Sequence, residues 1–206
     1  GNSPNFSLLS TATSQIRLTG NGNIDIETGT ESKTFPNLFV DNTQQMVQIL
    51  TSGASRITFR DITWVSVGII GTTRFRVLGG AAKTYGNIAI NNNVWTEIRG
   101  TTTVPDLNLY TGTVTFGTNT RADIYGNNEW SGALTVGSTI TNIADAFYLR
   151  DNNNFLASVL FTNAGPATVT ISEGDKSNTF SASVRFNGTQ NILNFNGSAN
   201  PASLLE

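Results

Sequence analysis

The sequence predicts an all-β protein, and the architecture it favours is a right-handed parallel β-helix. Three observations support this prediction. Thr, Asn and Gly fill 30, 25 and 20 of the 206 positions, and these residues suit strands and tight corners. Short segments of alternating apolar residues recur along the chain and end in Gly, Asn, Thr or Asp. No window of twelve residues holds apolar positions at helical spacing, so helices are not expected.

The recurring unit reads apolar, any residue, apolar, and is closed by a turn-forming residue. Alternation with a period of two over three to five residues is typical of strands. One segment, 142–149, fits one or two helical turns and fits a loop equally well. In chain order the predicted strands are 16–18, 24–26, 39–40, 88–90, 107–109, 114–116, 134–136, 169–171, 184–186 and 193–195.

Two architectures accommodate many short strands with dense turns, namely a β-solenoid and a β-sandwich or jelly roll. Comparable strands recur roughly every twenty to twenty-five residues, about one solenoid coil. Stacked coils would align like residues, and the amides of Asn91–Asn93 and Asp151–Asn154 could then form ladders, although plain loop composition explains these runs as well. The solenoid is favoured and the sandwich remains the alternative. At this spacing the coils begin at Phe35, Ile57, Phe75, Ile88, Leu107 and Leu134.

Four segments carry a resemblance to a known class. Residues 34–43 and 85–93 contain Asn, alternating apolar residues and then Asp or Asn, while 112–117 and 132–137 read Gly-x-Val/Leu-Thr-x-Gly. These motifs resemble repeat units of parallel β-helix segments in bacterial secreted and surface proteins, such as adhesins and autotransporter passengers. The resemblance covers residues 13–197 and implies a secreted or cell-surface location with a structural or adhesive role.

The whole chain, residues 1–206, is expected to be a single all-β domain excised from a larger protein. Gly1 looks like a residue left by tag cleavage, and Leu205-Glu206 looks like a cloning junction. Pro36 and the stretch around Trp64 depart from the repeat, which leaves room there for an insertion or a cap.

The composition excludes several kinds of chemistry. The chain has no His and no Cys, so it has no imidazole base, thiol nucleophile, disulfide or zinc site with nitrogen and sulfur ligands. With 12 basic and 14 acidic residues and a net charge of −2, nucleic-acid binding has no electrostatic basis. The apolar run 64–70 is too short to cross a bilayer. We therefore expect no enzyme, no cofactor, no metal and no membrane insertion.

A local excess of basic residues is the first candidate binding site. Between residues 54 and 83 the chain has five basic residues and one acid, Asp61. Arg74 and Arg76 would share one strand face, and arginine binds the carboxylate or sulfate of an acidic glycan through its planar fork. Alternatively, these arginines cover apolar surface and deter edge pairing. The cluster consists of Arg56, Arg60, Arg74, Arg76 and Lys83.

Aromatic residues beside polar turns are the second candidate. Trp95 follows Asn91–Asn93, and Trp130 follows Asn127, Asn128 and Glu129. Aromatic rings near loops can stack on sugars, and they can also act as lids over the end of a strand layer. Both tryptophans are therefore candidate ligand-binding residues with a structural alternative.

These features predict a non-catalytic structural or adhesive segment of a secreted or surface protein, with glycan, extracellular matrix or further copies of itself as partners. Two alternatives stay open. One is a carbohydrate-active β-helix enzyme of the polysaccharide lyase or depolymerase kind. The other is a β-sandwich module that binds glycan, as in phage tail fibres.

Overall fold

The computed structural model is a β-solenoid, which confirms the predicted β-helix. Every strand pair is parallel, whereas a β-sandwich would pair neighbouring strands in antiparallel fashion. Within the described residues there is no helix long and apolar enough to cross a membrane. The structure describes residues 15–20, 23–42, 46–51, 56–69, 72–99, 107–118, 120–137, 147–162, 167–173, 178–187 and 191–196.

Within the described residues the strands form two sheets, here called sheet A and sheet B. Sheet B has eight strands, one from each successive coil: β2 Ile24–Glu27, β4 Met46–Leu50, β6 Arg74–Leu78, β8 Trp95–Arg99, β11 Arg121–Ile124, β14 Phe147–Leu149, β17 Ala167–Glu173 and β20 Asn191–Asn196. Sheet A has twelve: β1 Gln15–Gly20, β3 Lys33–Asn42, β5 Ile57–Trp64, β7 Lys83–Ile90, β9 Leu107–Tyr110, β10 Val114–Phe116, β12 Asn127–Trp130, β13 Leu134–Val136, β15 Asn153–Phe155, β16 Val159–Phe161, β18 Asn178–Phe180 and β19 Val184–Phe186.

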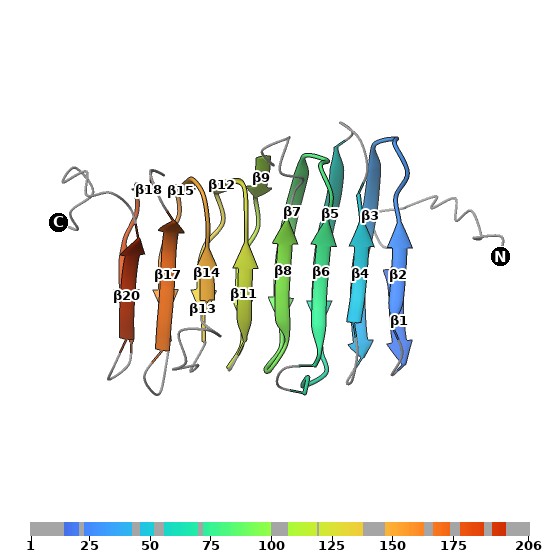
Figure 1. Ribbon diagram of the computed structural model, residues 1–206, viewed down its shortest axis with the longest axis horizontal. Coiled ribbons are helices and arrows are strands. Elements are labelled where there is room, and N and C mark those ends of the chain that lie inside the picture. Colours follow the sequence, from blue (N-terminus) through green and yellow to red (C-terminus); the bar gives the residue numbers. More distant parts are fainter. Residues whose placement is uncertain are drawn as a thin grey trace.

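The sense of winding can be followed in Figure 1. The strands of sheet B run upward in front, and those of sheet A run downward behind them. The chain meanwhile advances from the N-terminal side on the right to the C-terminal side on the left. Upward in front, downward behind and advancing leftward describes a right-handed coil, as expected for parallel crossovers.

Sheet A has a corner that runs along the solenoid axis. The long strands β3 and β5 pass through it at Pro36 and Arg60, where the pairing skips one residue. From β9 onward the corner separates two short strands, and Gly112 and Gly132 lie there. A Cβ atom added to Gly132 would lie 1.8 Å from the carbonyl oxygen of Gly112. The coils therefore approach too closely at this corner for any side chain on Gly132.

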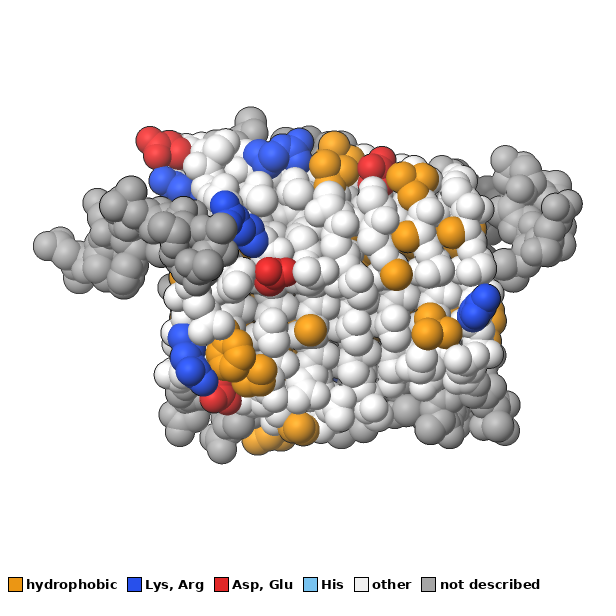
Figure 2. Space-filling model, turned by 180° about the vertical axis from the view of Figure 1, so that it is seen from behind, with side chains coloured by type: hydrophobic (Ala, Val, Ile, Leu, Met, Phe, Trp, Pro, Cys, Tyr) orange, Lys and Arg blue, Asp and Glu red, His pale blue; other side chains and the backbone are white. Residues whose placement is uncertain are grey.

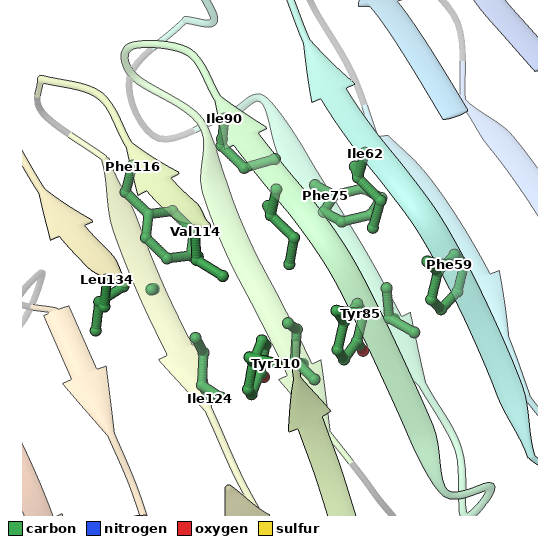
Figure 3. Packing of buried hydrophobic residues seen from close by; sticks show 14 of the residues in the cluster. Phe59, Ile62, Phe75, Tyr85, Ile90, Tyr110, Val114, Phe116, Ile124 and Leu134 are labelled. Carbon is green, nitrogen blue, oxygen red and sulfur yellow. The ribbon is translucent and has the colours of Figure 1, made fainter. Parts of the chain in front are cut away.

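A ladder of aromatic rings forms the centre of the core beneath sheet A. Neighbouring rings have centroids 3.8 to 5.7 Å apart and are tilted by at most 17°, and Figure 3 shows three of them as successive rungs. Such stacking adds about 0.5–1.5 kcal/mol per pair beyond the burial of area. The ladder consists of Phe35, Phe59, Tyr85, Tyr110, Trp130, Phe155 and Phe180.

An asparagine ladder lies two residues before the aromatic one. Asn108 Nδ2 donates to Asn128 Oδ1 at 2.8 Å, and Asn128 Nδ2 donates to Asn153 Oδ1 at 3.1 Å. Asn153 Nδ2 donates in turn to Asn178 Oδ1 at 3.1 Å. The amide ladder predicted for the run Asp151–Asn154 is thus confirmed through Asn153. Each amide satisfies the next along the axis, which allows these polar groups to be buried.

The run Asn91–Asn93 serves a different purpose, because it forms a corner. Asn91 Nδ2 donates to the carbonyl oxygen of Val65 at 2.7 Å, and Asn92 Oδ1 accepts from the backbone N–H of Thr118 at 2.7 Å. Asn93 adopts a left-handed conformation with φ of 65°, which asparagine tolerates better than most residues.

Two details of the sequence-based interpretation were wrong. Phe147–Leu149 of the segment 142–149 is strand β14, and residues 142–146 lie outside the described residues. Phe75 belongs to sheet B, whereas Ile57 and Ile88 belong to sheet A, so the predicted coil starts mixed two sheets. The true repeat varies from 20 to 28 residues between equivalent positions.

Replacing Trp130 by Ala should destabilise the protein by about 3–5 kcal/mol. Its indole is fully buried and stacks on Tyr110 and Phe155 at 3.8 and 5.7 Å. Urea unfolding followed by circular dichroism measures the loss. Trp130→Phe, which keeps a ring in the ladder, should lose less than half as much. A loss below about 1 kcal/mol for Trp130→Ala would contradict the ladder's role.

Asn128→Asp should cost about 3 kcal/mol or more at neutral pH. The change keeps the shape but replaces the Nδ2 donor, which serves Gly126 O and Asn153 Oδ1, by an acceptor. Burial raises the pKa of the new carboxyl group above its value of about 4 in the unfolded chain, so the deficit should shrink as the pH falls through this raised pKa. It should be smallest below about pH 4, with one donor restored by protonation. Asn154→Asp on the outward face of β15 is the control, and urea midpoints at both pH values test the contrast.

Candidate ligand-binding face

The middle of sheet B carries most of the arginines of the chain on its outward side. Inward residues of β6 such as Phe75 and Val77 are fully buried, while the alternate positions point to solvent. We call the outward group the arginine–aromatic face. It comprises Arg74 and Arg76 of β6, Trp95, Glu97 and Arg99 of β8, Arg121 and Asp123 of β11, Tyr125 after β11, Tyr148 of β14, and Arg150 after β14.

The first row of this face is an indole between two guanidinium groups. Arg74, Trp95 and Arg121 are in register on three neighbouring strands. The guanidinium carbon of Arg74 lies 4.3 Å from the Trp95 ring centroid, and that of Arg121 lies 5.8 Å from it. Because β6 and β11 flank β8 on opposite sides, the two arginines approach opposite faces of the ring.

The last row repeats this arrangement with a phenol ring. Arg99 and Arg150 lie over the ring of Tyr125 at 4.7 and 5.0 Å. Arg150 also lies 4.5 Å from the ring of Tyr148. Cation–π contacts of this kind contribute about 0.5–1 kcal/mol each at exposed sites.

The middle row supplies two carboxylates that tie the arginines together. Glu97 pairs with Arg76 at 2.6 Å and with Arg99 at 3.1 Å. Asp123 pairs with Arg99 at 2.9 Å and with Arg150. The side chains of Glu97 and Asp123 are only 4% and 10% exposed, whereas that of Arg99 is 38% exposed. The acids are covered by the arginines, which remain in contact with water.

The described residues of the arginine–aromatic face carry five guanidinium groups and two carboxylates. That is a surplus of three positive charges on one face of a chain whose net charge is −2. The surplus lies on a flat sheet, with the negative charge beneath it. The arrangement can hold anions through guanidinium groups that the neighbouring rings and carboxylates orient.

Sugar stacking on the ring of Trp95 is not available here, because arginines occupy both of its faces. The half-buried ring of Trp95 acts as a spacer between Arg74 and Arg121. The predicted stacking role of Trp95 is therefore replaced by an orienting role.

The outward side of sheet A is different in character. Figure 2, which views the molecule from behind, shows a surface of mostly uncharged polar groups with few charged side chains. A shallow hollow of about 160 Å³ lies there, lined by amide side chains such as Asn127 and Asn154 together with Glu129 and Leu107. It has one charged group and lacks a comparable cluster.

The structure divides the basic cluster predicted from sequence. Arg74 and Arg76 lie on the arginine–aromatic face together with Trp95, so these three residues are brought together as one site. Arg56 and Arg60 are exposed beside and within β5 of sheet A, where Arg56 donates to Thr84 Oγ1 at 3.0 Å.

Two of the predicted site residues are buried, so a surface ligand cannot reach them. Lys83 is fully buried in the column of the asparagine ladder, where Nζ donates to the carbonyl oxygens of Gly79 and Ala81 at 2.9 and 3.0 Å. Trp130 is a rung of the aromatic ladder. Both residues occupy strand positions whose side chains point into the solenoid, and for this reason the prediction that they bind a ligand was wrong.

Sequence reasoning missed most of the face. Arg99, Arg121 and Arg150 are 22 and 29 residues apart along the chain, and neither spacing matches a fixed repeat. The local signal was present as Arg-x-Arg, Trp-x-Glu-x-Arg, Arg-x-Asp-x-Tyr and Tyr-x-Arg, in which alternate positions are charged or aromatic. Only the register of the coils shows that these four segments lie side by side.

Among the described residues, no group of three or more His, Cys, Asp or Glu residues could hold a metal ion. Comparison of the chain with protein families, with curated proteins and with solved structures finds no match.

Proposed function

We propose that this chain is a non-catalytic structural or adhesive segment of a secreted or cell-surface bacterial protein, and that it binds glycan through the arginine–aromatic face. The observation that carries the proposal is the surplus of three positive charges on one flat face of an otherwise acidic chain. An acidic glycan supplies carboxylate or sulfate groups, which guanidinium recognises through paired hydrogen bonds.

The arginines of the face are already oriented before any ligand arrives. Arg74 stacks on Trp95, while Arg99 contacts Glu97, Asp123 and the ring of Tyr125. Ordering a long side chain costs about 0.5–1.5 kcal/mol on binding. Much of that cost has been met in folding, so each contact with an anion contributes more to the affinity.

A scaffold role is supported by the way the coils are joined. Each internal strand of sheet B is hydrogen-bonded to a strand on either side, and the core beneath sheet A is a continuous stack of rings. Such a body resists bending and presents a long flat surface. Repetitive solenoids use surfaces of this kind for extended partners.

The acids of the face support binding rather than hydrolysis. Glycoside hydrolysis needs two carboxyl groups that flank the scissile bond, one of them able to give a proton. Glu97 and Asp123 instead lie beneath arginines and contact them directly. Their position suits residues that hold guanidinium groups in place.

The double variant Arg74→Gln/Arg121→Gln should lose at least about tenfold in affinity for acidic polysaccharides, because hydrogen bonds to charged groups contribute about 1.5–3 kcal/mol each. The measurement is biolayer interferometry with immobilised protein and a panel of carboxylated, sulfated and neutral polysaccharides. Glu97 and Asp123 pair with Arg76, Arg99 and Arg150, and all five of these side chains are kept in the double variant.

Arg56→Gln/Arg60→Gln is the matched control, because it removes the same charge from sheet A. This control should bind as the unmodified protein does. Equal losses in both double variants would mean that only net charge matters and would contradict a site on sheet B. Release of reducing or unsaturated ends from any polysaccharide would refute the non-catalytic part of the proposal.

A further inference from the structure

We infer that the ligand of the arginine–aromatic face is a linear acidic polysaccharide that lies along the solenoid axis and offers an acid group about every two coils. This inference rests on the proposed function and specifies its ligand. The observation behind it is the pair of rows in which arginine, an aromatic ring and arginine follow one another from strand to strand.

The spacing of the arginines follows from the parallel register. Neighbouring strands of a sheet lie about 4.8 Å apart, so Arg74 and Arg121 stand about 9.6 Å apart with Trp95 between them. Arg99 and Arg150 are separated in the same way by Tyr125. Both rows therefore present positive charge at the same interval along the axis.

An extended sugar chain matches this interval, because successive sugars turn over and groups on one side of the chain recur every second sugar. A carboxylate or sulfate on that side meets the first arginine, and the next one meets the second arginine. The intervening sugar lies over the edge of the aromatic ring, where no charge is needed.

The middle row keeps the anionic chain on the outer rows. Glu97 and Asp123 lie between the two rows, and their negative charge disfavours an anion above them. The rows themselves are four residues apart along each strand, about 13 Å. In the last row Arg99 and Arg150 are paired with Glu97 and Asp123, so the first row holds the chain more tightly and dominates the measured affinity.

A nucleic acid fits the same face poorly. Each strand of DNA carries a charge about every 3.4 Å, so most of its phosphates would meet an aromatic ring or one of the two carboxylates. A polysaccharide with sparse charge leaves no acid group unpaired over Trp95 or Tyr125. The acidic polysaccharide is therefore the ligand class that the spacing favours.

The test exchanges one arginine and the tryptophan of the first row, as Trp95→Arg/Arg121→Trp. This variant has the same composition and net charge, but its two arginines stand one coil apart instead of two. Isothermal titration uses hyaluronan oligosaccharides, which carry a carboxylate on every second sugar. In the unmodified protein the tetrasaccharide, with two carboxylates, should bind at least about tenfold more tightly than the disaccharide, since the second contact is intramolecular.

In the exchanged variant the ratio of tetrasaccharide to disaccharide affinity should fall to about two, the statistical value for independent sites. Arg74→Trp/Trp95→Arg makes the same change of spacing with other residues, and it serves where the first variant does not fold. Circular dichroism establishes folding for each variant.

The outcomes separate this inference from the proposed function. Absence of binding to any acidic polysaccharide by the unmodified protein would refute the proposed function. Binding that is lost in Arg74→Gln/Arg121→Gln, yet keeps its length dependence in both exchanged variants, would leave the glycan site standing and overturn the spacing. Equal affinity for a thymidine oligonucleotide of the same charge would overturn the ligand class.

Discussion

The in-register stacking of parallel coils is the constraint on which the rest of the structure depends. Each residue lies directly over its counterpart in the next coil, so equivalent side chains of successive coils form columns along the axis. Inside, this produces the column that runs from Phe35 to Phe180 and the amide chain that begins at Asn108. Outside, the same rule places Trp95 between Arg74 and Arg121. The same register therefore sets both the core and the surface. A shift of one residue would move core side chains to the surface and surface side chains into the core.

Stacking also accounts for the scarcity of charge. A charged residue repeated in one column would face its own kind at about 4.8 Å, and like charges directly opposite destabilise a sheet. Threonine has no such penalty, and sheet A uses it in columns such as Thr58–Thr84 and Thr115–Thr135. Each arginine of the arginine–aromatic face lies beside an opposite charge or a ring, as Arg76 does beside Glu97. Glu97 and Asp123 face each other in register, and both pair with the surrounding arginines. The low charge content is a consequence of the fold, and the arginines of the arginine–aromatic face, which have no arginine directly opposite, follow the same rule.

The sequence was sufficient to predict the fold class, because alternation and turn residues are local signals. The sequence was insufficient to predict which residues form the site, because the residues that stack in one column are decided by the register between coils. Trp95 and Trp130 both follow polar turns, yet one points outward and the other lies in the core, and only strand parity separates them. The corners differ in length from coil to coil. Counting residues from one coil to the next therefore does not show which side chains point inward and which point outward. Proximity in sequence misled for the same reason, since Arg60 and Arg74 belong to different sheets.

The position of the arginine–aromatic face along the axis is itself favourable for binding. Its strands β6, β8, β11 and β14 are each paired on both sides, whereas β2 and β20 at the ends of sheet B have one partner within the described residues. Terminal strands open most readily, and internal strands need the loss of two ladders. Beyond β6, Met46 and Gln48 of β4 continue the outward columns without charge, and Gln48 accepts a hydrogen bond from Arg76 at 3.0 Å. The charged rows thus lie on the strands least able to fray, where the distance between arginines is held by the sheet itself.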